Sequence, residues 1–217
     1  TLRVLESALD AGASPAEARS AYWRQAIGRP TPPGDAVVLD KNPLHIPQLD
    51  AVARVFPDAR VVLLLRHPFD AALSCYMRDF APNPATAHFV DLESTAMLCA
   101  RLLDMVRCFE AAMPGRVLRI HYEHLVADFP GQVTRVLRGL GLDWHPDVAG
   151  YVDRPGEERF VRTPSHAQIV QSLYGSAVGR WLDYSDRLEG FREHLGPRLG
   201  HFGYGEADAT PAPGAGD

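Results

Sequence analysis

Arg66, Pro68 and Ser74 lie in the stretch VVLLLRHPFDAALSCY, and their types and spacing are those of a site for an anion. The apolar run that ends at Leu65 predicts a buried strand, and Pro68 suits the first turn of a helix that follows it. Arg66 therefore stands beside a helix N-terminus, whose free N–H groups and positive dipole end favour a negative charge. Its guanidinium is a planar fork of donors that matches a phosphate, and Ser74, two turns along the helix, adds a hydroxyl donor.

The sequence alone equally allows a purely structural role for Arg66. Its guanidinium can form an ion pair with Asp70, four residues along the chain, or with the more distant Asp40. Such a pair would stabilise the fold without binding a ligand. The sequence around Arg66 favours neither interpretation over the other.

Two further strands are predicted, and polar residues follow both. The run AVVLD over residues 36–40 predicts a buried strand with Lys41 just beyond it, and RVLRIHY predicts a strand that ends at Tyr122. Because ligands bind beyond the carboxyl ends of parallel strands, we expect Lys41, Arg66 and Tyr122 at one edge of a sheet, with Asp40 beside them. Structural roles are also open for both residues. Lys41 can form an ion pair with Asp40, and Tyr122 can end the strand with its hydroxyl in water.

Helical patterns separate and flank these strands. Their apolar residues recur every three or four positions, and Ser14 and Asp128 are candidate N-caps. Strands that alternate with helices predict an α/β fold, with a parallel sheet and helices on its faces. The helices are predicted over residues 2–28 with a break near Ser14, over 68–80, within 89–113 and within 128–142.

Composition limits the class of protein. The 217 residues suffice for one domain, and a formal charge of −5 argues against a general nucleic-acid or anionic-membrane binder. Three cysteines without paired spacing predict reduced thiols in a cytoplasmic protein. No apolar run approaches the roughly 20 residues that span a bilayer. We expect a domain over residues 1–204 and a disordered tail over 205–217, where GEADATPAPGAGD is rich in Gly, Pro and Ala.

Three stretches, in order along the chain, resemble the PAPS-dependent sulfotransferases, particularly bacterial domains related to tyrosylprotein sulfotransferases. PAPS is 3′-phosphoadenosine 5′-phosphosulfate. The stretch VLDKNPLHIPQLDAVARVFPDARVVLLLRHPFDAALSCY is similar to the centre of the family, with its Arg-x-Pro and a serine eight residues after the arginine. LRIHYEHLVADFPGQVTRVLRGLGL is similar to its Tyr-Glu-x-Leu strand end and following helix, and RTPSHAQIVQSLYGSAVGRW to its nucleotide-covering loop.

The resemblance implies roles for six residues. Arg66 and Ser74 correspond to the pair that holds the 3′-phosphate, and Tyr122 to a tyrosine that contacts the nucleotide. Ser165 and Arg180 match a serine and a basic residue of the covering loop, where the family often has lysine in place of Arg180. Lys41 resembles a lysine near the transferring sulfuryl group, where its charge would stabilise the leaving phosphate.

The sequence departs from the family pattern in two places. His67 follows Arg66 where many relatives carry Asp or Asn, so the local hydrogen bonding is expected to differ. The family's first strand and phosphate-cradling loop have no counterpart here, because RPTPPGD is too rich in proline to supply N–H groups. We therefore expect a three-layer, P-loop-like parallel sheet that lacks its first strand, in the C-terminal part of a sulfotransferase domain. The general base is expected upstream, and the missing central strand should leave apolar edges unpaired.

The leading hypothesis is an enzyme that transfers a sulfuryl group from PAPS to a hydroxyl acceptor, with PAP as the product and no metal. The acceptor class is open among small molecules, sugars, lipids and peptides. The alternative is a noncatalytic nucleotide-binding or interaction module with the same fold. A kinase-like phosphotransferase is a weaker third hypothesis, because no Walker loop is present.

Overall fold

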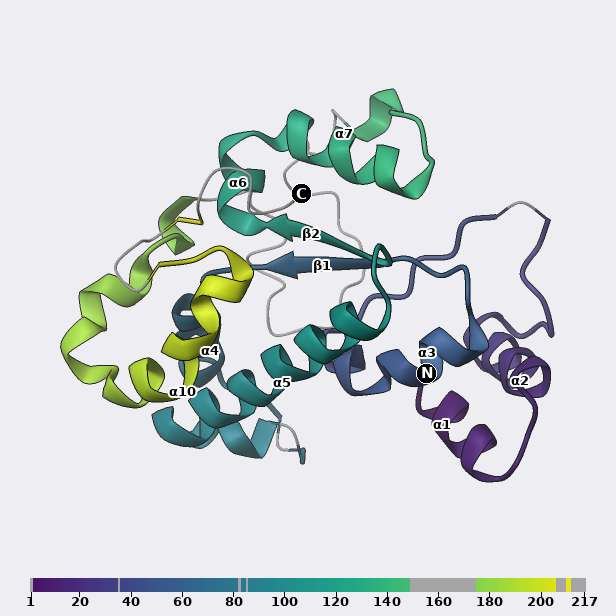
Figure 1. Cartoon of the computed structure of the whole chain (residues 1–217), viewed down its shortest axis with the longest axis horizontal. Helices are drawn as coiled ribbons and strands as arrows, with labels where there is room; N and C mark the ends of the chain where they lie inside the picture. The colour runs from purple at the N-terminus through teal and green to yellow at the C-terminus, as the bar shows by residue number, and fades with distance from the viewer. Residues whose placement is uncertain are drawn as a thin grey trace. The chain divides into compact units, whose positions relative to one another are not determined.

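The structure, a computed structural model, describes residues 2–34, 36–81, 83–84, 86–148, 175–205 and 210–211. The chain divides into two compact units (Figure 1). The first unit comprises Thr1–Val61 and Asp104–Val117, and the second comprises Val62–Leu103 and Leu118–Asp217.

The first unit is built mainly from helices α1 (Arg3–Asp10), α2 (Pro15–Ile27) and α3 (Leu49–Val55). The N-terminus of α2 forms as predicted: Ser14 accepts a hydrogen bond from the Glu17 N–H, and the Glu17 carboxylate accepts one from the Ser14 N–H. One apolar cluster joins the three helices and stabilises the unit. Its buried members are Leu2, Leu5, Ala18, Tyr22, Ala51 and Val55.

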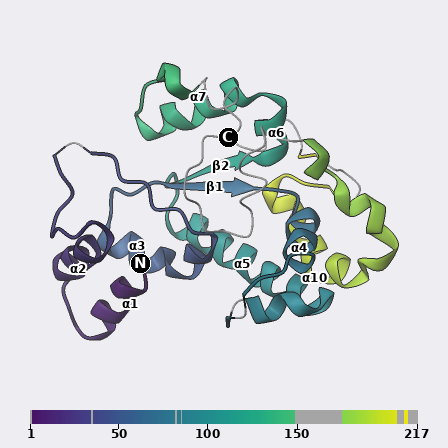
Figure 2. The ribbon, with the colours of Figure 1, turned by 180° about the vertical axis from the view of Figure 1, so that it is seen from behind.

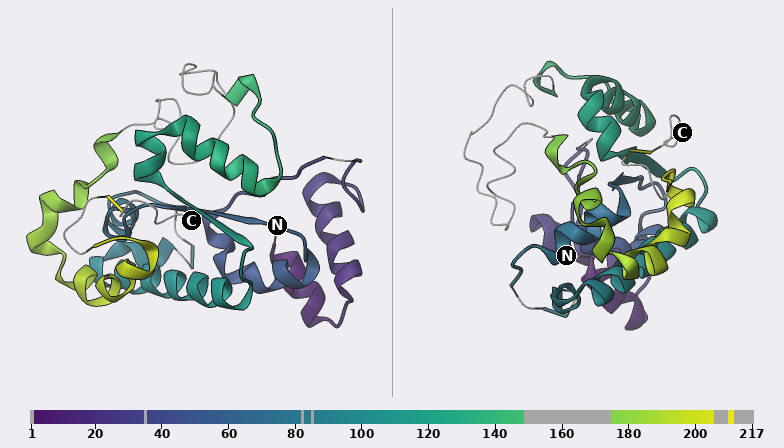
Figure 3. Two further views of the ribbon diagram at one scale, coloured as in Figure 1. Left: turned by 45° about the horizontal axis from the view of Figure 1, so that its top comes forward. Right: turned by 90° about the vertical axis from the view of Figure 1, so that its left-hand side faces the viewer.

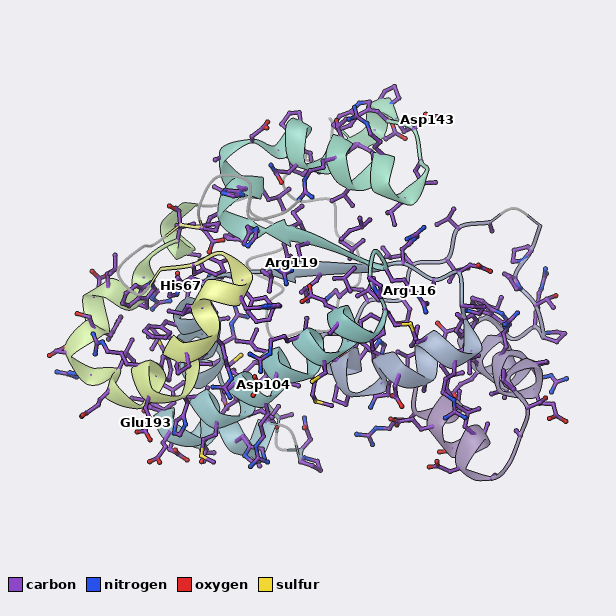
Figure 4. The ribbon with its side chains drawn as sticks, viewed as in Figure 1. His67, Asp104, Arg116, Arg119, Asp143 and Glu193 are labelled. Carbon is purple, nitrogen blue, oxygen red and sulfur yellow. The ribbon has the colours of Figure 1, made fainter. Side chains whose placement is uncertain are left out.

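Arg116, labelled in Figure 4, connects the end of α3 to the start of the first strand. Its guanidinium donates to the carbonyl oxygens of Phe56, at 2.7 Å, and Ala59, at 3.0 Å. Its own carbonyl accepts the Val61 N–H at 2.9 Å. These bonds hold the turn between the end of α3 and the start of the first strand.

The second unit contains a two-stranded parallel sheet, whose strands β1 and β2 run the same way in Figure 1. The helix α4 follows β1, and α6 begins directly after β2. From behind, Figure 2 shows α4 next to α10, and Figure 3 shows α6 and α7 in succession. These elements have the bounds β1 Val61–Leu65, β2 Val117–His121, α4 Pro68–Tyr76, α5 Leu92–Ala112, α6 Tyr122–Ala127, α7 Phe129–Leu140 and α10 Glu189–Leu199. Helix α5 and both strands have residues in each of the two units.

Aromatic and aliphatic side chains around α4 form the core of the second unit. Phe69 meets Trp181 edge-on, with ring centroids 5.1 Å apart, and meets Phe191 of α10 at 5.8 Å. Leu195, Leu199, Phe202 and Tyr204 are buried in the same unit. Trp181 is 2% exposed and packs in this core, which fixes the orientation of α4.

The predicted strand over residues 36–40 is wrong. This segment has no strand hydrogen bonding, and Val37, Val38 and Leu39 are 70%, 41% and 85% exposed. β-branched residues favour a strand only where a neighbouring strand accepts their N–H groups and a core buries their side chains, and neither exists here in the described residues.

The described sheet therefore has two strands rather than three, and β1 pairs directly with β2, with no strand between them. Val62 and Leu64 of β1 are exposed, so this small sheet leaves apolar side chains uncovered. No helix in the described ranges is long and apolar enough to cross a membrane. Cys75, Cys99 and Cys108 are all free thiols.

Candidate functional site

Arg66 lies where β1 ends and α4 is about to begin, as predicted. Its side chain is 21% exposed, and its Nη2 lies 3.6 Å from the Asp70 Oδ1 and donates to the Ala177 carbonyl. The structural ion pair with Asp70 is thus present. The buried Nε has no hydrogen-bond partner among the described residues, and part of the side chain stays exposed beyond its structural contacts.

His67 caps the N-terminus of α4. Its Nδ1 accepts the Phe69 N–H at 3.2 Å, which is the role that an Asp or Asn side chain plays at an N-cap. The ring is fully buried and stacks on Trp181 with centroids 4.9 Å apart. The imidazole at this position therefore supplies the acceptor that the helix start needs, and Figure 4 labels it.

Asp70 links α4 to the segment that carries Arg180. Its buried carboxylate accepts the Gly179 N–H at 2.8 Å and the Trp181 N–H at 2.9 Å. Burial raises the pKa of Asp70, and the Arg66 charge and the two N–H groups oppose that rise. Arg180 stands between the two bonded N–H groups with an exposed side chain, so Asp70 brings Arg180 and Arg66 into one cluster.

Ser74 and Tyr122 also belong to the second unit. Ser74 is half-buried and lies one helical turn beyond Asp70 on the same face of α4. Tyr122 is half-buried and opens α6 just past the end of β2, beside the end of β1 that precedes Arg66. The predicted edge thus joins these residues with Arg66.

The structure does not assign two predicted site residues, Lys41 and Ser165, to this cluster. Lys41 is exposed and belongs to the first unit. Its predicted alternative partner, Asp40, accepts the Tyr22 hydroxyl at 2.7 Å and lies 3.5 Å from His45, and no ion pair joins Asp40 to Lys41 among the described residues. Ser165 lies outside the described residues, as do most of the covering loop and most of the expected tail.

Sequence reasoning missed Glu123 and Tyr204. Glu123 is 4% exposed; its Oε1 accepts the His67 N–H at 2.8 Å and its Oε2 accepts the Tyr204 hydroxyl at 2.9 Å. Burial and the Glu123 charge raise the pKa of Tyr204. The position of Glu123 two residues after the end of β2 was a usable signal, but the bond to Tyr204 spans 81 residues and has no local signature.

The buried His121 at the end of β2 makes stability depend on pH. Its Nε2 lies 2.8 Å from the Phe202 carbonyl, and burial lowers its pKa. Because the unfolded chain takes up this proton near pH 6.5 and the folded chain only at lower pH, stability is lost as the pH falls below about 6.5.

We expect the free energy of unfolding to fall by about 1 kcal/mol between pH 7.5 and 5.5 on account of His121, as measured by urea denaturation at each pH. His121→Gln keeps a donor for the Phe202 carbonyl and should remove this part of the pH dependence of the free energy of unfolding. His88 is exposed, so His88→Gln should leave the pH dependence unchanged. An unchanged pH dependence in His121→Gln would contradict the assignment.

The chain is similar to several known proteins. A model described as the sulfotransferase family (Sulfotransfer_3) matches residues 4–146. An "Uncharacterized protein" of Aquifex aeolicus (strain VF5) is 25% identical over 171 residues, which cover 75% of this chain and 22% of that protein. A Caenorhabditis elegans protein described as "Putative protein-tyrosine sulfotransferase" is 22% identical over 178 residues, which cover 79% of this chain and 67% of that protein.

A solved structure shares the fold. The sulfotransferase domain from the curacin biosynthetic pathway matches with a TM-score of 0.59 at 14% identity, over 79% of this chain and 64% of that chain. The present chain therefore spans less than two thirds of the solved domain, and less than a quarter of the Aquifex protein.

Proposed function

Because the chain belongs to the sulfotransferase family, we propose that it takes part in moving a sulfuryl group from PAPS to a hydroxyl acceptor and carries the part that binds the 3′-phosphate. The acceptor is a small molecule, a sugar, a lipid or a peptide. We assign the sulfotransferase domain to residues 1–204, as the C-terminal part of a three-layer, P-loop-like α/β fold, and the tail to residues 205–217. The reduced state proposed for the three cysteines suits a cytoplasmic protein.

The proposed reaction is an in-line displacement at sulfur. The acceptor oxygen forms a bond to sulfur as the bond from sulfur to the bridging oxygen breaks, and that oxygen stays on the phosphate of the product, PAP. The acceptor hydroxyl gives its proton to a general base. Negative charge grows on the bridging oxygen, so a nearby cation lowers the barrier, and no metal ion is needed in this scheme. We assign that role to Lys41.

The observation that carries the proposal is the state of the Arg66 guanidinium. It lies beside the first turn of α4, and 21% of the Arg66 side chain is exposed although it pairs with Asp70 and donates to the Ala177 carbonyl. An anion at the exposed part of this side chain would add a charge-assisted hydrogen bond to these contacts. We propose that Arg66 and Ser74 hold the 3′-phosphate, and that Tyr122, Ser165 and Arg180 make the remaining contacts with the nucleotide.

The test is a calorimetric comparison of PAP with AMP, which lacks the 3′-phosphate. Wild-type protein should bind PAP more tightly, and Arg66→Ala should weaken PAP binding by about 1.5–3 kcal/mol, or roughly 10- to 150-fold, because a hydrogen bond to a charged group is lost. AMP binding should change little. Arg101→Ala removes an exposed arginine from α5 of the same unit and serves as the control. Equal affinities of the wild type for PAP and AMP would refute the proposal.

A further inference from the structure

One buried carboxylate holds together the two basic residues proposed for the nucleotide site. Asp70 lies 3.6 Å from the Nη2 of Arg66 and accepts the N–H groups of Gly179 and Trp181, which are 109 and 111 residues away in sequence. Its side chain has no exposed surface. Both carboxylate oxygens are thus in use, one toward Trp181 and Arg66 and the other toward Gly179.

Arg180 is the residue between the two N–H groups that Asp70 binds. Its side chain is exposed, while its backbone is fixed on both sides. Arg66 reaches the same segment directly, because it donates to the Ala177 carbonyl. Asp70 therefore sets the position of one arginine through an ion pair and of the other through the backbone.

The packing around Asp70 restricts it to this arrangement. Phe69, its neighbour on α4, is buried against Trp181 and Phe191, so α4 cannot rotate without breaking an aromatic contact. A carboxylate held in this way can accept several hydrogen bonds in fixed geometry, which a neutral amide of the same shape cannot do, since one of its two polar atoms is a donor.

We propose that Asp70 is a positioning residue for recognition of the 3′-phosphate, fixing the Arg66 guanidinium by an ion pair and the backbone that carries Arg180 by two hydrogen bonds. This inference rests on the proposed function. Asp70 itself does not touch the nucleotide, because its carboxylate would repel a phosphate and is already engaged. Its effect is exerted through the two arginines.

The experiment is a mutant cycle read out by the affinities for PAP and AMP. Asp70→Asn should weaken PAP binding about tenfold, because the ion pair and one backbone bond are lost, and should leave AMP binding within about twofold. In an Arg66→Ala, Arg180→Ala background the same substitution should change PAP affinity less than about twofold, because the residues that it positions are absent. Asp70→Glu keeps the charge, should show a smaller loss, and takes the place of Asp70→Asn in the cycle if that variant does not fold.

A second readout needs no nucleotide. Amide hydrogen exchange at Gly179 or at Trp181 should be at least about tenfold faster in Asp70→Asn, because the amide nitrogen of Asn cannot accept a hydrogen bond and one of the two N–H groups loses its acceptor. Tyr204→Phe, which removes a different buried hydrogen bond in the same unit, controls for general loss of stability and should leave both amides and the PAP-to-AMP ratio unchanged.

The outcomes separate the two proposals. If the wild type does not distinguish PAP from AMP, the proposed function and this inference both fail. If Arg66→Ala removes the discrimination and Asp70→Asn leaves it intact, the inference alone fails. An equal loss of PAP and AMP affinity in Asp70→Asn, or a loss that persists in the double-arginine background, assigns Asp70 a structural role only and likewise overturns the inference.

Discussion

Replacement of Lys41 by alanine is expected to lower the rate of sulfuryl transfer about 10²–10³-fold while PAP affinity changes less than about threefold. The difference arises because the charge on the bridging oxygen develops in the transition state, so the proposed contact with Lys41 matters most there. The side chain is exposed, and in the described ranges no ion pair with Asp40 occupies it. Lys41 is also the only lysine in the sequence, whose other cationic side chains are arginines and histidines.

Single-turnover transfer from PAPS, measured beside a PAP titration, separates the two effects of Lys41→Ala. Lys41→Arg keeps the positive charge but presents its donors in a different geometry, so this variant should retain more of the transfer rate than Lys41→Ala. Because Lys41 is the one lysine, reductive ¹³C-methylation gives one lysine signal in the NMR spectrum besides that of the chain terminus. Addition of PAP should shift the Lys41 signal. A variant with weakened PAP binding and a normal rate at saturation would move Lys41 from catalysis to binding.

The helices were predictable because their signals are local. Ser14 caps α2, Pro68 opens α4, and Asp128 accepts the Gly131 N–H at the start of α7, each within a few residues of the position that sequence indicated. The same holds for the place of Arg66 between a strand and a helix. A cap or a proline acts on the turn in which it stands, so the fold elsewhere has little influence on it.

The strand over residues 36–40 and the connections of the site were not predictable in this way. A strand forms only where a neighbouring strand is available for hydrogen bonding, and the local sequence AVVLD does not indicate whether such a strand exists. Asp70 was recognised only as a possible partner of Arg66, because its bonds to Gly179 and Trp181 join segments more than 100 residues apart. Such contacts depend on tertiary packing, which leaves no fixed spacing in the chain.

Loss of the Glu123 side chain should strongly destabilise the second unit. Its two oxygens accept the His67 N–H and the Tyr204 hydroxyl, and all three groups are buried. Glu123→Ala leaves two donors without partners, each at about 1–3 kcal/mol, and creates a cavity, so we expect a loss of about 3–5 kcal/mol in the free energy of unfolding. The loss should appear in urea denaturation of the whole chain, followed by far-ultraviolet circular dichroism and by the fluorescence of Trp181 and the other tryptophans.

Two milder variants should lose less stability than Glu123→Ala, in a defined order. Tyr204→Phe removes one of the two bonds without leaving the His67 N–H unsatisfied and should cost about 1 kcal/mol, the usual net value of a hydrogen bond. Glu123→Gln keeps one acceptor oxygen in the same volume, so its loss should lie between those of Tyr204→Phe and Glu123→Ala. That order follows from the number of buried donors left without a partner. If Glu123→Ala costs no more than Tyr204→Phe, the carboxylate does not bridge His67 and Tyr204, and the end of β1 is held by the aromatic packing of His67 on Trp181 instead.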